Sequence, residues 1–141
     1  MKELLGFLGK KLTEKELSIA FTESATAGRL AAEFSLIEDA GKFLKGGVVC
    51  YDASLKESLL NVPKKLIEHY TPESMEVTRA ITEGLSVLIP ADLHAGITGL
   101  TCPGGSETKE KPVGTMFLYC SYKNMPLFSN KVFFEGSRNK S

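Results

Sequence analysis

The segment Leu17-Ser18-Ile19-Ala20-Phe21, together with the turn Thr22-Glu23-Ser24-Ala25-Thr26-Ala27-Gly28 that follows it, decides the fold. A short apolar run that ends in small and polar residues is typical of a buried strand leading into a helix. We therefore predict a strand over residues 17–21 and a helix that begins near Thr26. A competing interpretation extends the preceding helix through this segment, because Thr13-Glu14-Lys15-Glu16 resembles a capping box.

Apolar strands and amphipathic helices alternate along the rest of the chain. Leucines at helical spacing predict a helix over residues 2–14, and Thr71-Pro72-Glu73 predicts the start of another helix that Pro90 ends. A short helix is predicted between a cap at Asp52 or Ser54 and Leu60. The remaining strands are predicted at 43–51, 91–99, 114–122 and 127–134, the last two as a hairpin around Asn124-Met125-Pro126.

This order of elements predicts the fold class. Strands that alternate with helices and close with a hairpin are typical of a mixed sheet covered on both faces. We predict an α/β fold, a three-layer α/β/α sandwich with a mixed sheet and a C-terminal antiparallel strand pair. A single domain over residues 1–141 is expected, because most domains hold about 100 to 200 residues.

The composition argues against several classes of partner. Seventeen Lys and Arg residues balance 17 Asp and Glu residues, so the chain lacks the broad attraction that nucleic-acid or membrane binding needs. No apolar run approaches the about 20 residues of a membrane helix, and the first residues do not match a signal peptide. A cytoplasmic protein is therefore expected. Cys50, Cys102 and Cys120 lack metal-ligand spacing, so we expect no metal site and reduced, mostly buried thiols.

Ser24, Tyr51 and Thr98 each fall where a predicted strand ends. In α/β sheets, sites form at the carboxyl ends of strands, near helix N-termini. A turn with Ser24, followed by Tyr51 and Lys56 at the next strand, has the residues of a Ser–Lys acyl-transfer site. A lysine that acts as a base must lose its proton, and burial lowers its pKa from the usual value of about 10.4.

Each of these residues also has a structural interpretation that stays open. Ser24 is suited to cap a helix, and Glu23 is suited to be a solvated charge near a helix N-terminus. Lys56 on its own is typical of a surface lysine, and Tyr51 of a ring at a sheet edge.

A glycine-rich loop follows Thr98, with the sequence Gly99-Leu100-Thr101-Cys102-Pro103-Gly104-Gly105-Ser106. Its backbone N–H groups are suited to an anion nest or an oxyanion hole, although such a loop is more often a simple turn. The charged residues 107–111 are expected to be its solvated continuation. Near the C-terminus, Arg138 has the side chain that grips a phosphate with two parallel hydrogen bonds, unless it is an ordinary exposed arginine.

Taken together, these segments resemble the C-terminal domain of the CinA (competence-damage-inducible) family in its stand-alone form, a family that includes nicotinamide-nucleotide amidases. The resemblance runs from Leu17 to Arg138. Its motifs are Glu-Ser-x-Thr-x-Gly at 23–28, Gly46-Gly47-Val48-Val49 leading to Tyr51 and Lys56, Thr98-Gly99 leading to Pro103-Gly104-Gly105, Lys111-Pro112-Val113-Gly114-Thr115, and Gly136-x-Arg138. Each motif alone is weak, whereas their order and spacing together are specific.

The resemblance implies an enzyme that hydrolyses the carboxamide of nicotinamide mononucleotide to nicotinic acid mononucleotide and ammonia. Ser24 would be the nucleophile, Lys56 the base that takes its proton, and Tyr51 a residue that relays or orients that proton. Thr98 would position the amide, and Arg138 would hold the phosphate. The other substrate-binding residues would be Thr26, Gly28, Gly46, Gly47, Gly104 and Gly105. The resemblance further implies that no metal or organic cofactor is needed, and that the chain forms a homo-oligomer, with a dimer favoured.

Four residues depart from the usual pattern of the family. Ala25 and Ala27 stand where the family usually has Cys and Gly, and Thr101 and Cys102 replace small residues in the glycine-rich loop. Alanine at position 27 is harmless in a helical conformation and costly where φ is positive. These departures keep a second hypothesis open, a pyridine-nucleotide-binding or regulatory module of the same fold with little or no turnover.

Overall fold

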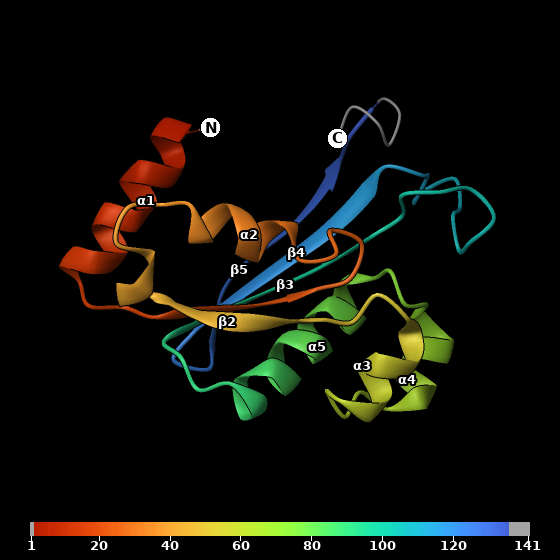
Figure 1. The fold of residues 1–141 in the computed structure, drawn as a ribbon. Helices are drawn as coiled ribbons and strands as arrows, with labels where there is room; N and C mark the ends of the chain where they lie inside the picture. Colours follow the sequence, from red (N-terminus) through yellow and green to blue (C-terminus); the bar gives the residue numbers. More distant parts are fainter. Residues whose placement is uncertain (1, 136–141) are drawn as a thin grey trace.

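A five-stranded mixed sheet lies at the centre of the computed structural model, which describes residues 2–135 (Figure 1). The strand order is β2-β1-β3-β4-β5. β1 pairs in parallel with β2 and β3, whereas β4 pairs antiparallel with both β3 and β5. The strands are β1 (Ile19–Glu23), β2 (Leu44–Val49), β3 (Leu93–Gly99), β4 (Thr115–Tyr122) and β5 (Met125–Phe133). Arg138, with the rest of its motif, lies outside the described residues.

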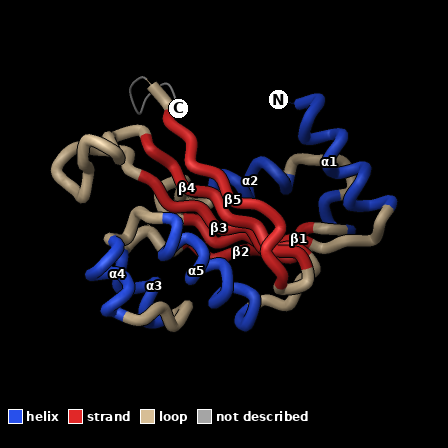
Figure 2. Tube along the Cα trace, turned by 180° about the vertical axis from the view of Figure 1, so that it is seen from behind, coloured by secondary structure: helices blue, strands red, loops and turns tan. Residues whose placement is uncertain are grey.

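Helices cover both faces of this sheet. α1 and α2 lie on one face, and α3, α4 and α5 lie on the other (Figure 1, Figure 2). The helices are α1 (Lys2–Glu14), α2 (Arg29–Ser35), α3 (Ala53–Ser58), α4 (Lys64–Tyr70) and α5 (Met75–Leu88), with a short 3-10 helix at Ala40–Lys42. The predicted three-layer α/β/α sandwich, with a mixed sheet and a C-terminal antiparallel strand pair, is confirmed.

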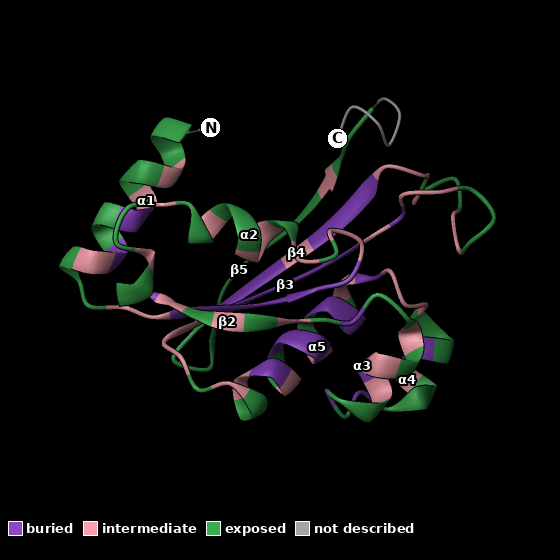
Figure 3. Cartoon of the chain, viewed as in Figure 1, coloured by how far each residue is buried: buried purple, intermediate pink, exposed green. Residues whose placement is uncertain are grey.

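Two apolar clusters fill the spaces between the layers. Ala20 and Ile81 belong to the cluster between the sheet and α5. Phe21 belongs to the cluster on the opposite face, where its ring centroid lies 4.7 Å from that of Phe34 on α2. Because β1 is covered on both faces, all five of its residues are buried, whereas nearly all of β5 is exposed (Figure 3).

The elements around the first strand begin later than predicted. β1 extends to Glu23 because Thr22 and Glu23 stay in the ladder with β2. α1 ends at Glu14, so the interpretation that extended this helix through the first strand is wrong. α2 begins at Arg29 rather than near Thr26, since the intervening turn contains positive backbone angles.

The predicted helix start at Thr71 is also wrong. Thr71 has a φ of 71° and follows α4, a helix that the sequence pattern did not predict. α5 begins at Met75, with Ser74 as its N-cap, and the Ser74 hydroxyl accepts a hydrogen bond from the Val77 N–H at 3.2 Å. Residues Thr71-Pro72-Glu73 therefore form the turn that precedes α5, and the helix itself begins after them.

Candidate active site

The carboxyl ends of β1, β2 and β3 lie at one edge of the sheet, because these strands are parallel (Figure 1). Backbone hydrogen bonds continue one residue past the strand ends. The Ser24 N–H donates to the Ile97 carbonyl at 3.0 Å, and the Cys50 N–H donates to the Glu23 carbonyl at 2.8 Å. The residue that follows each strand is therefore held by the sheet itself.

Ser24 and Lys56 form a hydrogen-bonded pair at this edge. The Lys56 Nζ lies 3.0 Å from the Ser24 Oγ and donates a second bond to the Cys50 carbonyl at 3.0 Å. Lys56 is 1% exposed and Ser24 is 7% exposed. The interpretations of Lys56 as a surface lysine and of Ser24 as the helix cap are thus wrong, since the N-cap of α2 is Gly28. The predicted proximity of Ser24 and Lys56 is confirmed.

Burial leaves more of the Lys56 side chain in the neutral amine form, which can accept a proton, than in an ordinary lysine. Desolvation lowers the pKa of its amine below the usual value of 10.5, while the negative charges of Glu73 and Asp52 oppose this by favouring the ammonium form. Asp52 also caps α3, because its side chain accepts a hydrogen bond from the Ser54 N–H at 2.9 Å. A lysine with a lowered pKa, in contact with a serine hydroxyl, is the arrangement that activates a serine nucleophile.

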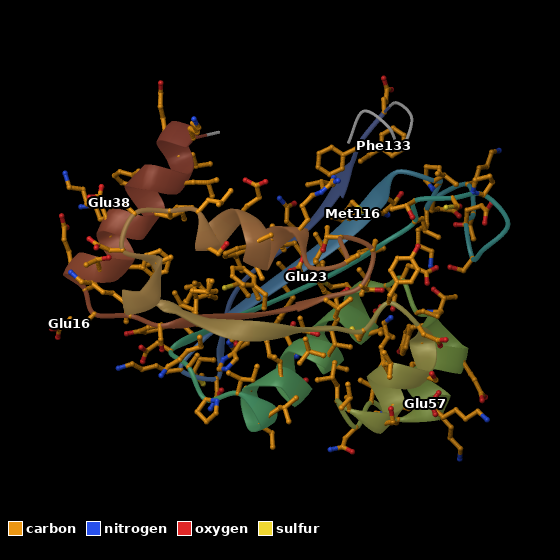
Figure 4. The ribbon with its side chains drawn as sticks, viewed as in Figure 1. Glu16, Glu23, Glu38, Glu57, Met116 and Phe133 are labelled. Carbon is orange, nitrogen blue, oxygen red and sulfur yellow. The ribbon has the colours of Figure 1, made fainter. Side chains whose placement is uncertain are left out.

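Glu23 is the residue whose environment the sequence interpretation missed. It is 1% exposed and lies between α2 and the sheet (Figure 4). Its carboxylate accepts hydrogen bonds from the Thr26 hydroxyl at 2.6 Å and from the N–H groups of Leu30 at 2.8 Å and Ala31 at 3.0 Å. The carboxylate satisfies N–H groups at the start of α2, so the expected effect on the helix N-terminus is present but the expected solvation is not.

The turn between Ser24 and α2 requires left-handed backbone conformations. Ala27 has a φ of 51° and Gly28 has a φ of 97°. The Ala27 N–H donates to the Ser24 carbonyl at 3.1 Å, so the turn folds back on the serine. Ala27 is therefore the costly kind of departure, because an alanine occupies a position that favours glycine.

Gly46 and Gly47 serve the pairing of β2 with β1. A Cβ at Gly47 would lie 2.7 Å from the Phe21 carbonyl oxygen, which leaves no room for a side chain. Gly46 has a φ of 144° next to a register shift between Ile19 and Ala20. The pairing of β2 with β1 therefore accounts for glycine at both positions. Contact of either glycine with substrate stays a prediction.

Thr98 is fully buried where β3 ends, on the α5 side of the sheet. Its hydroxyl lies 2.9 Å from the Thr78 hydroxyl, which itself donates to the Ser74 carbonyl at 2.5 Å. Because Thr78 has a single hydroxyl hydrogen and gives it to Ser74, Thr98 must donate in the shared bond. The Thr98 oxygen then keeps only its acceptor capacity, which suits the N–H₂ group of an amide.

Tyr51 lies at the surface, with 58% of it exposed. Within residues 2–135, no hydrogen bond joins its hydroxyl to Ser24 or Lys56. The structure therefore brings Ser24 and Lys56 together without Tyr51, and the relay role of Tyr51 stays a prediction.

The glycine-rich loop contains a turn suited to bind an anion, and the carboxylate of Glu107 occupies it. The Gly104 N–H donates to the Glu107 carboxylate at 2.8 Å, and Gly104 has a φ of 93°. Backbone hydrogen bonds from Gly104, Glu107 and Gly105 lower the pKa of the Glu107 carboxyl, in that order of their effect. Glu107 is thus bonded to the loop, and the expectation that residues 107–111 are simply solvated is wrong for it.

Two features are absent from the described residues. No helix among them is long and apolar enough to cross a membrane. Nor do residues 2–135 contain a group of three or more His, Cys, Asp or Glu side chains arranged to hold a metal ion.

Comparisons with known proteins agree with this fold. The model of the CinA C-terminal domain matches residues 1–141. A CinA-like protein of Thermosipho melanesiensis is 38% identical over 131 residues, which cover 92% of this chain and 32% of that protein. A putative competence-damage inducible protein of Desulforudis audaxviator is 37% identical over 111 residues, which cover 79% of this chain and 27% of that protein. The chain thus spans about a third of the length of these curated relatives.

Solved structures are similar over nearly the whole chain. A competence-damaged protein (CinA) superfamily protein from Escherichia coli is 27% identical, with a TM-score of 0.90 over 99% of this chain and 80% of that one. A competence/damage inducible protein from Agrobacterium tumefaciens has the same fold, with a TM-score of 0.90 over 99% of this chain and 84% of that one, at 23% identity. With the fold, the order of the motifs and the family model in agreement, the chain belongs to the CinA C-terminal domain family.

Proposed function

We propose that this chain is an amidohydrolase that converts nicotinamide mononucleotide to nicotinic acid mononucleotide and ammonia by a Ser–Lys mechanism. The observation that carries the proposal is the 3.0 Å contact between the Lys56 Nζ and the Ser24 Oγ in a site where Lys56 is 1% exposed. The family resemblance supports the choice of substrate, since the family includes amidases of this nucleotide.

In the first step, the neutral Lys56 amine takes the proton of the Ser24 hydroxyl while the Ser24 oxygen attacks the carboxamide carbon. A tetrahedral oxyanion forms, and it collapses as the Lys56 ammonium returns its proton to the leaving nitrogen. Ammonia leaves, and an ester joins Ser24 to the nicotinoyl group. The low pKa of Lys56 serves both halves of this step, because the amine must accept a proton and then release it.

In the second step, water hydrolyses the ester. Lys56 takes a proton from the water as the water oxygen attacks the carbonyl carbon, and the Ser24 oxygen is the leaving group. Returning that proton to Ser24 regenerates the enzyme and releases the carboxylic acid product. One water is consumed and one ammonia is released in each cycle.

Other residues are proposed to hold the substrate. Thr98 accepts a hydrogen bond from the amide nitrogen, in keeping with its acceptor capacity beside Thr78. Tyr51, which is exposed, is proposed to relay or orient the proton that passes between Ser24 and Lys56. Arg138, which lies outside the described residues, is proposed to grip the phosphate. The further proposed contacts are Thr26, Gly28, Gly46, Gly47, Gly104 and Gly105.

Ammonia release from nicotinamide mononucleotide by the pure protein tests the proposal. Ser24→Ala and Lys56→Met are each expected to lower kcat at least about a thousandfold, because nucleophile and base act as a unit. Ser35→Ala and Lys65→Met, at exposed positions, are matched controls that should retain activity. Absence of ammonia release by the wild type, or a Ser24→Ala variant as active as the wild type, refutes the proposal.

A pyridine-nucleotide-binding module without turnover is the second candidate. One observation favours it: the Gly104 N–H, which the loop would otherwise offer to the oxyanion formed during turnover, is already bonded to Glu107. This candidate requires nucleotide binding, measured by calorimetry, with no acid product after long incubation.

The oligomeric state and the cellular location are proposals as well. A homo-oligomer, with a dimer first, is supported by exposed apolar side chains on β5: Met125, Leu127, Phe128 and Phe133. A monomeric mass in light scattering at micromolar concentration would contradict it. A cytoplasmic location agrees with a nucleotide substrate and with reduced thiols at Cys50 and Cys120.

A further inference from the structure

The turn between α4 and α5 is strained and heavily bonded. Thr71 combines a φ of 71° with a ψ of 157°, a strongly unfavourable conformation for a β-branched residue. The Ser74 hydroxyl donates to the Thr71 carbonyl at 3.0 Å, and the Thr71 hydroxyl donates to the Glu73 carbonyl at 3.2 Å. Such strain persists only where surrounding contacts hold the backbone in place.

Contacts of that kind come from the loop 101–113, which consists of the glycine-rich loop and its charged continuation. The Lys111 Nζ donates to the Thr71 hydroxyl oxygen at 2.5 Å and to the Glu73 carbonyl at 2.7 Å. The Ser106 hydroxyl donates to the Glu73 carboxylate at 2.5 Å. We call these three bonds the clasp. Lys111 is only partly exposed, and burial lowers the pKa of its amine, so this lysine is drawn onto the turn instead of extending into water.

The clasp joins two segments that are each connected to Thr98 at the candidate active site. The loop starts just after Thr98, and its base is closed by a hydrogen bond from the Leu100 N–H to the Thr115 carbonyl at 2.9 Å. The turn leads into α5, whose Thr78 bonds to Thr98. The charge of Glu73 also acts on Lys56, where it favours the ammonium form. The position of the loop relative to Ser24 and Lys56 is therefore coupled to the clasp.

We propose that Glu73 and Lys111 are positioning residues of this site: they fasten the loop 101–113 to the turn before α5, and the fastened loop forms a wall of the substrate pocket. The proposal rests on the proposed function, because it assigns the clasp to nucleotide binding. It assigns no contact with the reacting atoms to either residue. Its specific consequence is that breaking the clasp weakens nucleotide binding while leaving the chemical step at Ser24 nearly intact.

Two pairs of variants test the clasp. Lys111→Met removes both lysine bonds, and Lys109→Met, at an exposed position on the same loop, is its control. Glu73→Ala removes the acceptor for Ser106, and Glu76→Ala, an exposed acid in the first turn of α5, is its control. Glu73→Gln is the rescue variant, because an amide oxygen still accepts the Ser106 hydrogen bond.

Two measurements are made on each variant: KM and kcat with nicotinamide mononucleotide, and hydrogen exchange of the loop amides. Lys111→Met and Glu73→Ala are expected to raise KM about tenfold, with kcat within about twofold of wild type, and to speed exchange in residues 101–113. Glu73→Gln should restore the wild-type KM and exchange. The controls should match the wild type.

Several results overturn the proposal. Loop exchange in Lys111→Met equal to that in Lys109→Met means that no clasp holds the loop. Faster exchange with an unchanged KM means that the clasp is structural only, as does a fall in kcat with an unchanged KM. If the wild type releases no ammonia, the proposed function fails by itself. Calorimetric affinity for nicotinamide mononucleotide then replaces KM, and equal affinities in the wild type and Lys111→Met overturn the positioning role.

Discussion

Replacing Ala27 by glycine is expected to stabilise the protein. Ala27 has a φ of 51° in the turn that leads from Ser24 to α2. A left-handed conformation costs an L-residue about 1–2 kcal/mol, and glycine avoids this cost. Glycine also loses more freedom on folding, which subtracts about 0.5–1 kcal/mol. The free energy of unfolding should therefore rise by about 0.5–1 kcal/mol in Ala27→Gly.

The same substitution at Ala32 is the matched control. Ala32 lies exposed within α2, where its N–H donates to the Gly28 carbonyl at 3.0 Å. No positive φ is relieved at this position, so Ala32→Gly should lower the free energy of unfolding by about 1 kcal/mol. One chemical change is thus expected to act with opposite signs at two nearby alanines.

Urea unfolding followed by circular dichroism measures both variants. Equal m values in the wild type and the variants allow the midpoints to be compared directly. A midpoint that falls in Ala27→Gly as far as it falls in Ala32→Gly would refute the reasoning, because Ala27 would then lack a left-handed conformation to relieve. Retained ammonia release by Ala27→Gly is the accompanying check that the turn still presents Ser24.

Three further outcomes are expected for Glu73, Gly84 and Cys120. Glu73→Gln should move the rising limb of the kcat/KM pH profile to lower pH, because the charge of Glu73 favours the Lys56 ammonium and its removal lowers the pKa of the amine. A limb that stays in place or moves to higher pH contradicts this. Gly84→Ala should lower the free energy of unfolding by about 1–3 kcal/mol, since the new Cβ would lie 2.2 Å from the Leu60 carbonyl oxygen, and an unchanged urea midpoint would count against that contact. Burial raises the pKa of Cys120 to about 11, so a thiol reagent at mildly alkaline pH should label Cys120 only after unfolding, as mass spectrometry of labelled peptides can check.

The sequence predicts the sheet better than the helices that lead to the site. Apolar runs ending at Ser24, Tyr51 and Thr98 were enough to locate strand ends, because parallel strands buried on both faces are continuous apolar segments. α4 was missed because it is short and buries only Ile67 fully, so it has little helical periodicity. Thr71 was misinterpreted as a cap because its hydroxyl and the following proline fit a helix start, whereas its backbone angle is set by tertiary contacts.

In the candidate site, too, some features follow from the sequence pattern and others depend on tertiary contacts. The contact between Lys56 and Ser24 is predicted from their combination, whereas Ser24 alone is more typical of a helix cap and Lys56 alone of a surface charge. Glu23 is interpreted as solvated because acids usually are, and only the N–H groups of α2 explain its burial. The clasp joins residues that are 33 to 40 positions apart in the sequence, and no local sequence pattern predicts such a contact.

The alternation of side chains along β1 has a consequence for which changes the chain tolerates. Glu23 faces α2, and Ser24, the next residue, faces Lys56 on the opposite side of the sheet. A slip of one position in the pairing of β1 would turn a carboxylate toward the lysine and a hydroxyl toward the helix. Contacts with the helices on both faces of the sheet therefore depend on the same register of β1. Relatives that keep the Ser24–Lys56 pair should therefore lack insertions or deletions of a single residue in β1, even insertions or deletions that would preserve its apolar pattern.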